Sequence, residues 1–341
     1  MTLSLISIGL SDEKDLSLRA LEEARDCDQL YAELYTMKLA TTIASLTELT
    51  LRPVQYLRRY DLEDRADLII EEARGKHIGV LVGGDCLSAT THMSLVIEAA
   101  KRGVNVSIIH GSGIFTAVAE SGLSIYKFGR TVTLPFEDKG SVDTTLKGIK
   151  DNLDQGLHTL VLLDLDNEIN KFMTINHALR RLFESGFDQG NLVIGVARLG
   201  SKGSMIKAGM AGNIAELDFG DPPHSLIIPG SLHFLEVEAL KTIGDCPQEA
   251  LQGRVVKSEI DALIEKYIKV CRRVRAEMKI NAPSITLTEN QVQSLLGHVD
   301  KYLSDAEYYS TERKATSLAS VSYAEGILDA LKMLGISEFE W

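Results

Sequence analysis

The sequence is 341 residues long, with 45% hydrophobic and 25% charged residues, a net charge of −12 and a pI of about 5.2. At roughly 100–200 residues per domain, this length suggests two or three domains, and the composition is that of a globular protein with a sizeable core. The acidic balance argues against a protein that binds nucleic acid by neutralising phosphates, so we expect no direct nucleic-acid partner.

The four cysteines lie far apart in the sequence and show no spacing typical of a metal site. This pattern argues against zinc and against a disulfide framework, and we expect no metal ligands. The start, MTLSLISIGLSDEKD, lacks the basic region and cleavage site of a signal peptide, and we interpret it as a first strand. No window approaches 18 apolar residues. We therefore expect a cytoplasmic protein without a membrane partner.

Short apolar runs alternate with amphipathic segments over the first 112 residues. The expected strands are residues 3–9, 29–35, 78–82 and 104–110, and the expected helices are residues 12–27, 62–74 and 88–102. Ser11 is the predicted N-cap of the first helix. This alternation indicates βαβ units and a mostly parallel sheet, and we assign residues 1–112 to an N-terminal α/β lobe.

A second series of the same kind follows. The expected strands are residues 131–135, 159–165, 192–196 and 225–229, with helices at residues 141–153 and 174–185. Glycines at 111, 113 and 122 loosen the chain between the two series, and we assign residues 113–250 to a second α/β lobe. Two lobes joined in this way make a cleft, which is the usual place for a small ligand.

The pattern changes in residues 251–341, which we expect to form an all-α helical bundle. Helices are predicted at residues 260–274, 288–310 and 313–334, the first of them from apolar residues at three- and four-residue spacing. In such a bundle Tyr308, Tyr309 and Tyr323 are expected in the core. The basic stretch Lys269–Arg275 is interpreted as a solvated helix face, with contact to RNA as the alternative.

The stretch GVLVGGDCLSATTH, residues 79–92, ends an apolar strand in two glycines, an aspartate and small hydroxyl residues. The carboxyl end of a parallel strand is where open α/β folds bind ligands, and glycine lets the backbone approach another group closely. From these residues alone, a ligand site with Asp85 as a polar contact and a tight strand-to-helix turn stay equally open. The sequence has no GxGxxG after the first strand, no P-loop and no GxSxG elbow, which excludes the common nucleotide and hydrolase motifs.

The chain carries a series of longer motifs, in this order: IGLSDEKDLSLRALEEARDCDQLYAELYT, GGDCLSATTH, IHGSGIFTAVAESGLSIYKFG, GLHTLVLLDL, VARLGS and DFGDPPHSLIIPGSLH. The series covers roughly residues 1–250 and resembles the diphthine synthase family. The resemblance implies a two-lobed, tetrapyrrole-methylase-like methyltransferase fold with the cofactor in the interlobe cleft. The tail DAEYYSTERKATSLASVSYAEGILDALKMLGI resembles a small archaeal helical family of unknown function, which supplies no activity.

The resemblance also implies an activity. Members of the family are S-adenosyl-L-methionine-dependent N-methyltransferases of diphthamide biosynthesis, and they release S-adenosyl-L-homocysteine. The implied partner is translation elongation factor 2, whose modified histidine is methylated to diphthine, and the implied assembly is a homodimer. The nucleophile is the amine of the acceptor, so the enzyme needs alignment of donor and acceptor rather than a nucleophilic side chain. No catalytic residue is assigned.

The family's cofactor contacts carry over to single residues of this chain. They are Leu10, Asp85 and Ser88 in the first lobe, Gly113 and Ile114 at the crossing between lobes, and Leu163, Leu199 and His224 in the second lobe. Taken singly, the three leucines could equally be core residues, and His224 could be a packed residue after two prolines.

Two positions depart from the family pattern. Cys86 stands where the family motif has proline, and Gly113 stands where it often has serine. The departures leave two alternatives open. One is a related methyltransferase that acts on a tetrapyrrole or another small acceptor. The other is a non-catalytic, divergent scaffold or binding protein that keeps the fold.

Overall fold

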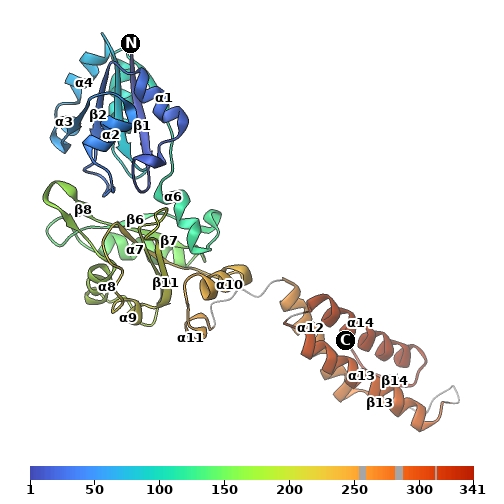
Figure 1. The fold of residues 1–341 in the computed structure, drawn as a ribbon. Coiled ribbons are helices and arrows are strands. Elements are labelled where there is room, and N and C mark those ends of the chain that lie inside the picture. The colour runs from blue at the N-terminus through green and yellow to red at the C-terminus, as the bar shows by residue number, and fades with distance from the viewer. Residues whose placement is uncertain (253–258, 281–286, 312) are drawn as a thin grey trace. The chain divides into compact units, whose positions relative to one another are not determined.

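The computed structural model describes residues 1–252, 259–280, 287–311 and 313–341. The chain divides into two compact units, Met1–Val255 and Val256–Trp341, and each has a hydrophobic core of its own. The first unit contains two lobes, each built on a β-sheet, and the second is helical (Figure 1). The predicted class, an α/β protein followed by an all-α bundle, is therefore confirmed.

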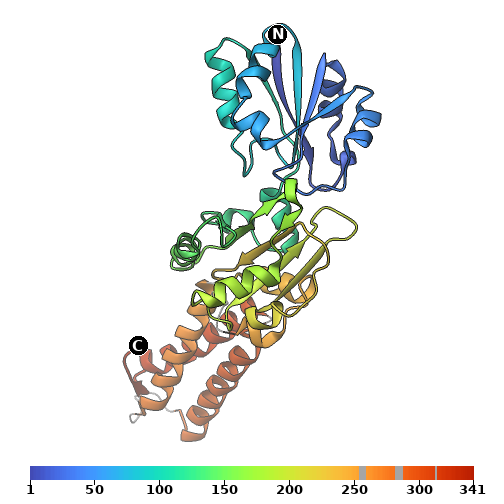
Figure 2. The same cartoon turned by 90° about the vertical axis from the view of Figure 1, so that its left-hand side faces the viewer.

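The first lobe is a parallel sheet with helices on both faces. In the order β3-β2-β4-β1-β5, its strands are β1 (Thr2–Gly9), β2 (Gln29–Glu33), β3 (Val54–Leu57), β4 (His77–Gly83) and β5 (Asn105–Ile109). Helices α4 (Ala66–Ala73) and α5 (Met93–Lys101) pack on one face, and α1 (Leu18–Asp26) and α2 (Ile43–Thr50) on the other (Figure 2). The expected parallel sheet is confirmed here, since strands buried on both faces are near-continuous apolar runs.

The second lobe differs from the expectation of a mostly parallel sheet. In the order β11-β10-β12-β7-β6, its strands are β6 (Val132–Leu134), β7 (Thr159–Leu163), β10 (Leu192–Ala197), β11 (Met205–Met210) and β12 (His224–Ile228). Among the described pairs of this sheet, β6 and β7 alone run parallel. The expectation is wrong because residues 198–204 between β10 and β11 are too few for a crossover helix, so the chain turns back as a hairpin.

Helices of the second lobe lie on both sides of its sheet. They are α7 (Asp143–Leu153), α8 (Ile175–Glu184), α9 (Ala211–Ile214), α10 (Phe234–Thr242) and α11 (Gln248–Leu251). Residues from α7 and α8 belong to one core cluster, and residues from α10 and α11 belong to another. The helices predicted at residues 141–153 and 174–185 correspond closely to α7 and α8.

Two predicted helices of the first lobe are shorter than expected. Residues 12–27 divide because the Asp15 carboxylate accepts a hydrogen bond from the Ser11 N–H at 2.6 Å, which closes a separate turn, η1 (Glu13–Asp15). Helix α1 begins after Ser17, whose hydroxyl caps it, so Ser17 and not Ser11 is the N-cap. Residues 62–74 likewise divide into α3 (Arg59–Glu63) and α4.

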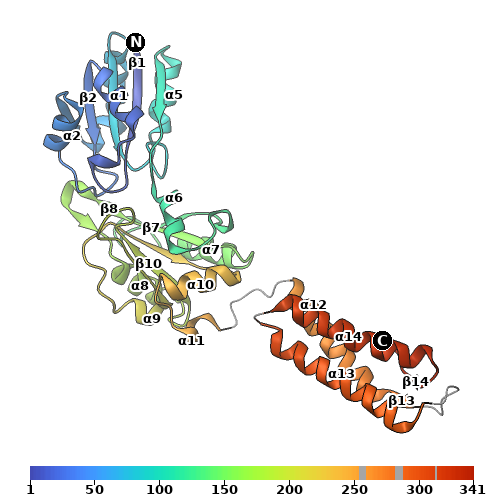
Figure 3. The same cartoon turned by 45° about the vertical axis from the view of Figure 1, so that its right-hand side comes forward.

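Two segments connect the lobes. The chain crosses between them at residues 110–113 and enters α6 (Ile114–Ala117), followed by the short turns η2 (Val118–Ser121) and η3 (Ile125–Lys127). A hairpin of the second lobe, β8 (Leu165–Asp166), η4 (Asn167–Ile169) and β9 (Lys171–Phe172), extends to the first lobe (Figure 3). In η4, the Asn167 amide donates to the Leu34 carbonyl at 2.6 Å, and the Glu168 carboxylate accepts from the Arg59 N–H at 3.2 Å.

The helical unit is formed by α12 (Glu259–Glu277), α13 (Glu289–Tyr309) and α14 (Lys314–Met333), with a short pair of strands, β13 (Lys279–Ile280) and β14 (Ser337–Glu338). Its core contains apolar residues of all three helices, and Thr288 caps α13 at the predicted start. Within the described ranges, no helix combines the length and the apolar character needed to cross a membrane.

Two expectations for the helical unit can be compared with its surface. The basic stretch of α12 is partly ion-paired, because Arg272 contacts Glu307 at 2.6 Å and Arg275 contacts Asp300 at 3.4 Å. This agrees with a solvated face. The core positions expected for Tyr308 and Tyr323 are wrong, since their side chains are 78% and 65% exposed. Both lie off the apolar stripe that their helices bury, which the isolated motif does not reveal.

Replacement of Gly195 in β10 by alanine tests the packing behind the second sheet. A Cβ there would lie 2.4 Å from the ring of Phe219 and 3.0 Å from Ile175. We expect the free energy of unfolding to fall by about 1–3 kcal/mol, measured by urea denaturation followed by circular dichroism. The control is Gly209→Ala in β11, where the nearest contact would be an ordinary 3.5 Å. Equal effects of the two substitutions would contradict this account.

Candidate functional site

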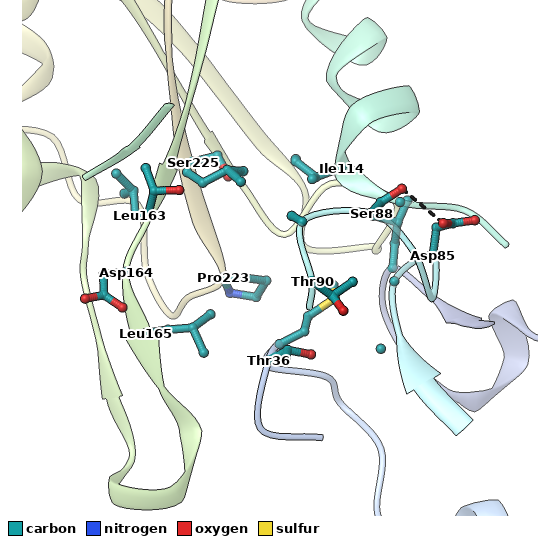
Figure 4. Close-up of a pocket in the computed structure, with 18 of the residues that line it drawn as sticks. Thr36, Asp85, Ser88, Thr90, Ile114, Leu163, Asp164, Leu165, Pro223 and Ser225 are labelled. Atoms are coloured by element: carbon teal, nitrogen blue, oxygen red, sulfur yellow. Dashed lines mark hydrogen bonds between the residues drawn. The ribbon is translucent and has the colours of Figure 1, made fainter. Parts of the chain in front are cut away.

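A pocket of about 330 Å³ lies between the two lobes of the first unit, at the carboxyl ends of β4 and β7 (Figure 4). Every residue that the sequence resemblance assigns to the cofactor lines this one pocket. These residues are Leu10, Asp85, Ser88, Gly113, Ile114, Leu163, Leu199 and His224. They come from six separate segments of the chain, so only the fold brings them together.

The turn after β4 is fixed by the Asp85 carboxylate. One oxygen accepts hydrogen bonds from the Leu87 N–H at 3.1 Å and the Ser88 hydroxyl at 3.0 Å. The other accepts from His110 Nδ1 at 2.8 Å and the Gly111 N–H at 3.3 Å. Burial alone would raise the pKa of the Asp85 carboxyl, but these donors hold it below its ordinary value. Asp85 therefore joins the β4 turn to the crossing between lobes.

This hydrogen bonding also explains why the next helix starts late. The predicted helix over residues 88–102 begins only at Met93, as α5. Residues before it form an irregular turn in which Ala89 has a φ of +57°, outside the helical region. The turn directs Ser88, Thr90 and Thr91 toward the pocket, which they line.

Both departures from the family motif lie against Asp85. The Cys86 N–H donates to the Ser7 hydroxyl at 2.9 Å, a hydrogen bond that proline could not make, and its thiol is buried against backbone carbonyls of Leu5 and Ile109. A Cβ on Gly113 would lie 3.3 Å from the backbone nitrogen of Asp85, tighter than most contacts. The hydrogen bond from Cys86 to Ser7 thus holds the turn in place of proline, and Gly113 allows the crossing to lie close to the backbone of Asp85.

Arg198 builds the wall of the pocket on the second lobe. Its guanidinium donates to the Phe219 carbonyl at 2.7 Å and also to the Asp221 carbonyl. Its backbone N–H donates to the Pro223 carbonyl at 2.9 Å. These bonds tie the turn after β10 to the loop before β12. As a result Leu199 and His224, which come from these two segments, face one pocket.

His224 has an unused hydrogen-bonding atom. Its Nδ1 accepts from the Ile175 N–H at 3.4 Å, so Nε2 carries the proton, and Nε2 has no partner among the residues that the structure describes. The side chain is 93% buried, since its relative exposure is 7%. Burial, and then the charge of Arg198, lower the pKa of His224, although hydrogen bonding to the backbone of Asp221, Phe219 and Gly220 opposes that shift. Since His224 lines the pocket, Nε2 is a candidate donor to a ligand there.

The remaining wall of the pocket comes from residues 35–37, after β2. The Thr36 N–H and hydroxyl donate to the Glu33 carboxylate at 2.9 and 3.0 Å, and the Arg59 guanidinium lies over the Tyr35 ring at 5.2 Å. Glu33 is fully buried. Its burial raises the pKa to about 7, although the bonds from Thr36 and the charge of Arg59 oppose that shift.

Sequence reasoning missed several residues that line the pocket. They are Tyr35, Thr36, Arg59, Glu63, Asp164 and Arg198. Asp164 follows β7 as Asp85 follows β4, so the rule that polar residues at strand ends face the ligand could have found it. Thr36 follows β2 and Arg59 follows β3, so the same rule could have found them once these strands were assigned.

The chemistry available in this pocket is that of positioning. It offers fixed backbone groups, hydroxyls, a neutral histidine and an apolar floor of Leu10, Ile114 and Leu163. In the described part of the chain, no group of three or more His, Cys, Asp or Glu side chains is arranged to hold a metal ion. Such a site can hold two reactants against each other while they exchange a group.

Glu33→Gln tests the cost of burying this carboxyl. Because the pKa of Glu33 is raised from 4.5 to about 7, the folded state keeps a proton that the unfolded state has lost. Wild-type stability therefore falls, relative to the variant, as pH rises from 4.5 to about 7. We expect the variant to gain about 3 kcal/mol over the wild type across that range. Urea denaturation at several pH values measures this, and a difference that stays constant with pH would contradict it.

Comparisons with known proteins agree with the motifs. Residues 2–215 match the family of Tetrapyrrole (Corrin/Porphyrin) Methylases, and residues 266–337 match a family described as a protein of unknown function. A diphthine synthase of Methanosphaera stadtmanae is 42% identical over 260 residues, covering 73% of this chain and 98% of the relative. A diphthine synthase of Methanosarcina mazei is 39% identical over 265 residues, covering 74% and 99%.

A solved structure shows the same relation. The crystal structure of a diphthine synthase is similar with a TM-score of 0.70 at 37% sequence identity, and the similarity covers 73% of this chain and 98% of that chain. These relatives match about three quarters of the chain, so the resemblance drawn from the motifs of the first 250 residues is confirmed.

Proposed function

This chain belongs to the diphthine synthase family of methyltransferases, and we propose that it transfers methyl groups from S-adenosyl-L-methionine to the modified histidine of translation elongation factor 2. The product would be the trimethylated intermediate diphthine, with S-adenosyl-L-homocysteine released. With this acceptor the protein would act in the cytoplasm, and we propose a homodimer as in its family.

The single observation that carries this proposal is that all eight residues assigned to the cofactor line one pocket. The chemistry of the pocket also suits the cofactor. The orphaned Nε2 of His224 can donate to a nitrogen or oxygen of the adenosyl or methionine part. Gly113 leaves room at the crossing, and the leucines Leu10, Leu163 and Leu199 supply apolar surface for adenine.

When bound, the cofactor supplies an electrophilic methyl group on a sulfonium. The protein's part in the transfer is to align that methyl with the acceptor amine and to keep competing water out. The turn held by Asp85 and the wall held by Arg198 are fixed by several hydrogen bonds each, so the pocket is organised before any ligand enters. Neither group acts as a nucleophile.

The proposed function is tested by incubating the purified chain with S-adenosyl-L-methionine and elongation factor 2 that carries the unmethylated precursor. Mass spectrometry of the acceptor should show mass increases of one, two and then three methyl groups on the modified histidine. An acceptor in which that histidine is unmodified is the control. A folded chain that binds the cofactor but adds no methyl group to the precursor would contradict the proposed acceptor.

His224→Asn tests the cofactor contact. Asparagine can still accept from the Ile175 N–H but lacks the donor at the position of Nε2. We expect the dissociation constant for S-adenosyl-L-homocysteine, measured by calorimetry, to rise about tenfold, because a hydrogen bond of about 1.4 kcal/mol is lost. The matched control is His298→Asn on the exposed surface of α13, which should bind as the wild type does. Unchanged affinity in both variants would remove His224 from the site.

A further inference from the structure

The family assignments leave one question open, namely which group of the pocket holds the acceptor amine. An amine is a cation near neutral pH, and a partly buried cation needs a counter-charge. The pocket is lined by three carboxylates, those of Glu63, Asp85 and Asp164. They differ in how much of their accepting capacity the protein itself uses.

Asp85 and Glu63 are poorly suited to the amine. Asp85 already accepts four hydrogen bonds, about as many as a carboxylate has lone-pair sites. Glu63 lies 3.8 Å from the Arg59 guanidinium, and its side chain is 42% exposed, so water screens its charge.

Asp164 retains unused hydrogen-bond accepting capacity and is more buried than Glu63. One of its oxygens accepts from the Phe136 N–H at 3.0 Å, and the other lies 3.3 Å from the Lys139 ammonium. Among the described residues, these contacts occupy half of its lone-pair sites. The side chain is 16% exposed, and its backbone N–H and carbonyl are bonded to Leu134 and Met173, which fixes its position at the end of β7.

Asp164 also lies apart from Asp85 and Ser88, which belong to the turn after β4. Figure 4 shows Asp164 and Leu165 on the opposite side of the pocket from Asp85 and Ser88, with Pro223 and Thr90 between them. Two residues assigned to the cofactor are close to it: Leu163 precedes Asp164, and His224 precedes Ser225, which pairs with Leu162 on the neighbouring strand. Asp164 therefore lies at the edge of the assigned cofactor residues, which is where a second reactant can meet the cofactor.

We propose that Asp164 is the residue that binds the acceptor amine and directs it to the methyl group. The inference rests on the proposed function, since it requires an amine acceptor. The amine first loses one proton to solvent, and in the first two transfers Asp164 accepts a hydrogen bond from a remaining N–H. Before the third transfer the dimethylated nitrogen has no N–H left, and the carboxylate acts on it through its charge alone. The nitrogen lone pair then forms the bond to the methyl carbon while the carbon–sulfur bond breaks, and its electron pair stays on sulfur. The new ammonium faces the carboxylate charge, and a proton leaves to solvent before the next transfer.

Asp164→Asn tests this role because it keeps the size of the side chain and removes its charge. We expect kcat/KM for the unmethylated acceptor to fall by about 10–100-fold, the range for a lost charge-assisted hydrogen bond. The affinity for S-adenosyl-L-homocysteine and the midpoint of thermal unfolding should stay close to the wild-type values. Asp138→Asn is the matched control, because Asp138 is an exposed carboxylate nearby that pairs with Lys171.

Lys139→Met distinguishes amine binding by Asp164 from stabilisation of the fold by its ion pair. The variant removes the ion pair and leaves the Asp164 carboxylate in place. If Asp164 only stabilises the fold through Lys139, this variant should lose as much activity as Asp164→Asn, and that result would overturn the inference. Unchanged methylation by a folded Asp164→Asn protein would overturn it as well. If the wild type adds no methyl group to the precursor, the proposed function fails and the inference fails with it. Loss of methylation in Asp164→Asn, but not in Asp138→Asn or Lys139→Met, supports both the proposed function and the inference.

Discussion

The site depends on the Asp85 carboxylate, which binds the turn after β4 to the crossing between the lobes. A buried carboxylate is costly unless donors surround it, and here the Ser88 hydroxyl, His110 and two backbone N–H groups satisfy it. Because two of these donors belong to the turn after β4 and two to the crossing, the turn and the crossing are fixed together. The motif GGDC is thus first of all an architectural element, and its contact with a ligand comes in addition.

On the opposite side of the pocket, side chains likewise hold the structure through hydrogen bonds to other parts of the protein. Arg198 ties two loops of the second lobe, and the β8–β9 hairpin binds the first lobe through Asn167 at Leu34 and through Glu168 at Arg59. The lobes are therefore joined on one side by the covalent crossing and on the other by hydrogen bonds. This leaves His224 and Asp164 as pocket groups with unused capacity, one a donor and the other an acceptor. We propose that the first serves the cofactor and the second the amine.

The sequence allowed a large part of this structure to be predicted, for identifiable reasons. The apolar runs of β1 and β4 and the helices between them predicted the parallel first lobe, because strands buried on both faces give a strong signal. The antiparallel second lobe was not predicted, since pairing direction depends on loop length and β11, with Lys207 and Gly209, lacks a continuous apolar run. Asp85 was also a candidate from its position at a strand end, whereas the other seven pocket residues came from the family resemblance alone. Asp164 was missed because the apolar residues on either side of it, Leu163 and Leu165, are typical of a buried core strand.

The account's central claim is that the pocket between the lobes is the cofactor site. The most direct measurement is a crystal structure of the full chain grown with S-adenosyl-L-homocysteine. The account predicts the ligand between the Asp85 turn and the Arg198 wall, with His224 Nε2 within hydrogen-bonding distance of it and the Asp164 carboxylate facing open space beside the sulfur. Ligand density outside this pocket, or in it with His224 Nε2 still unpartnered and Asp164 covered by the ligand, would contradict the account.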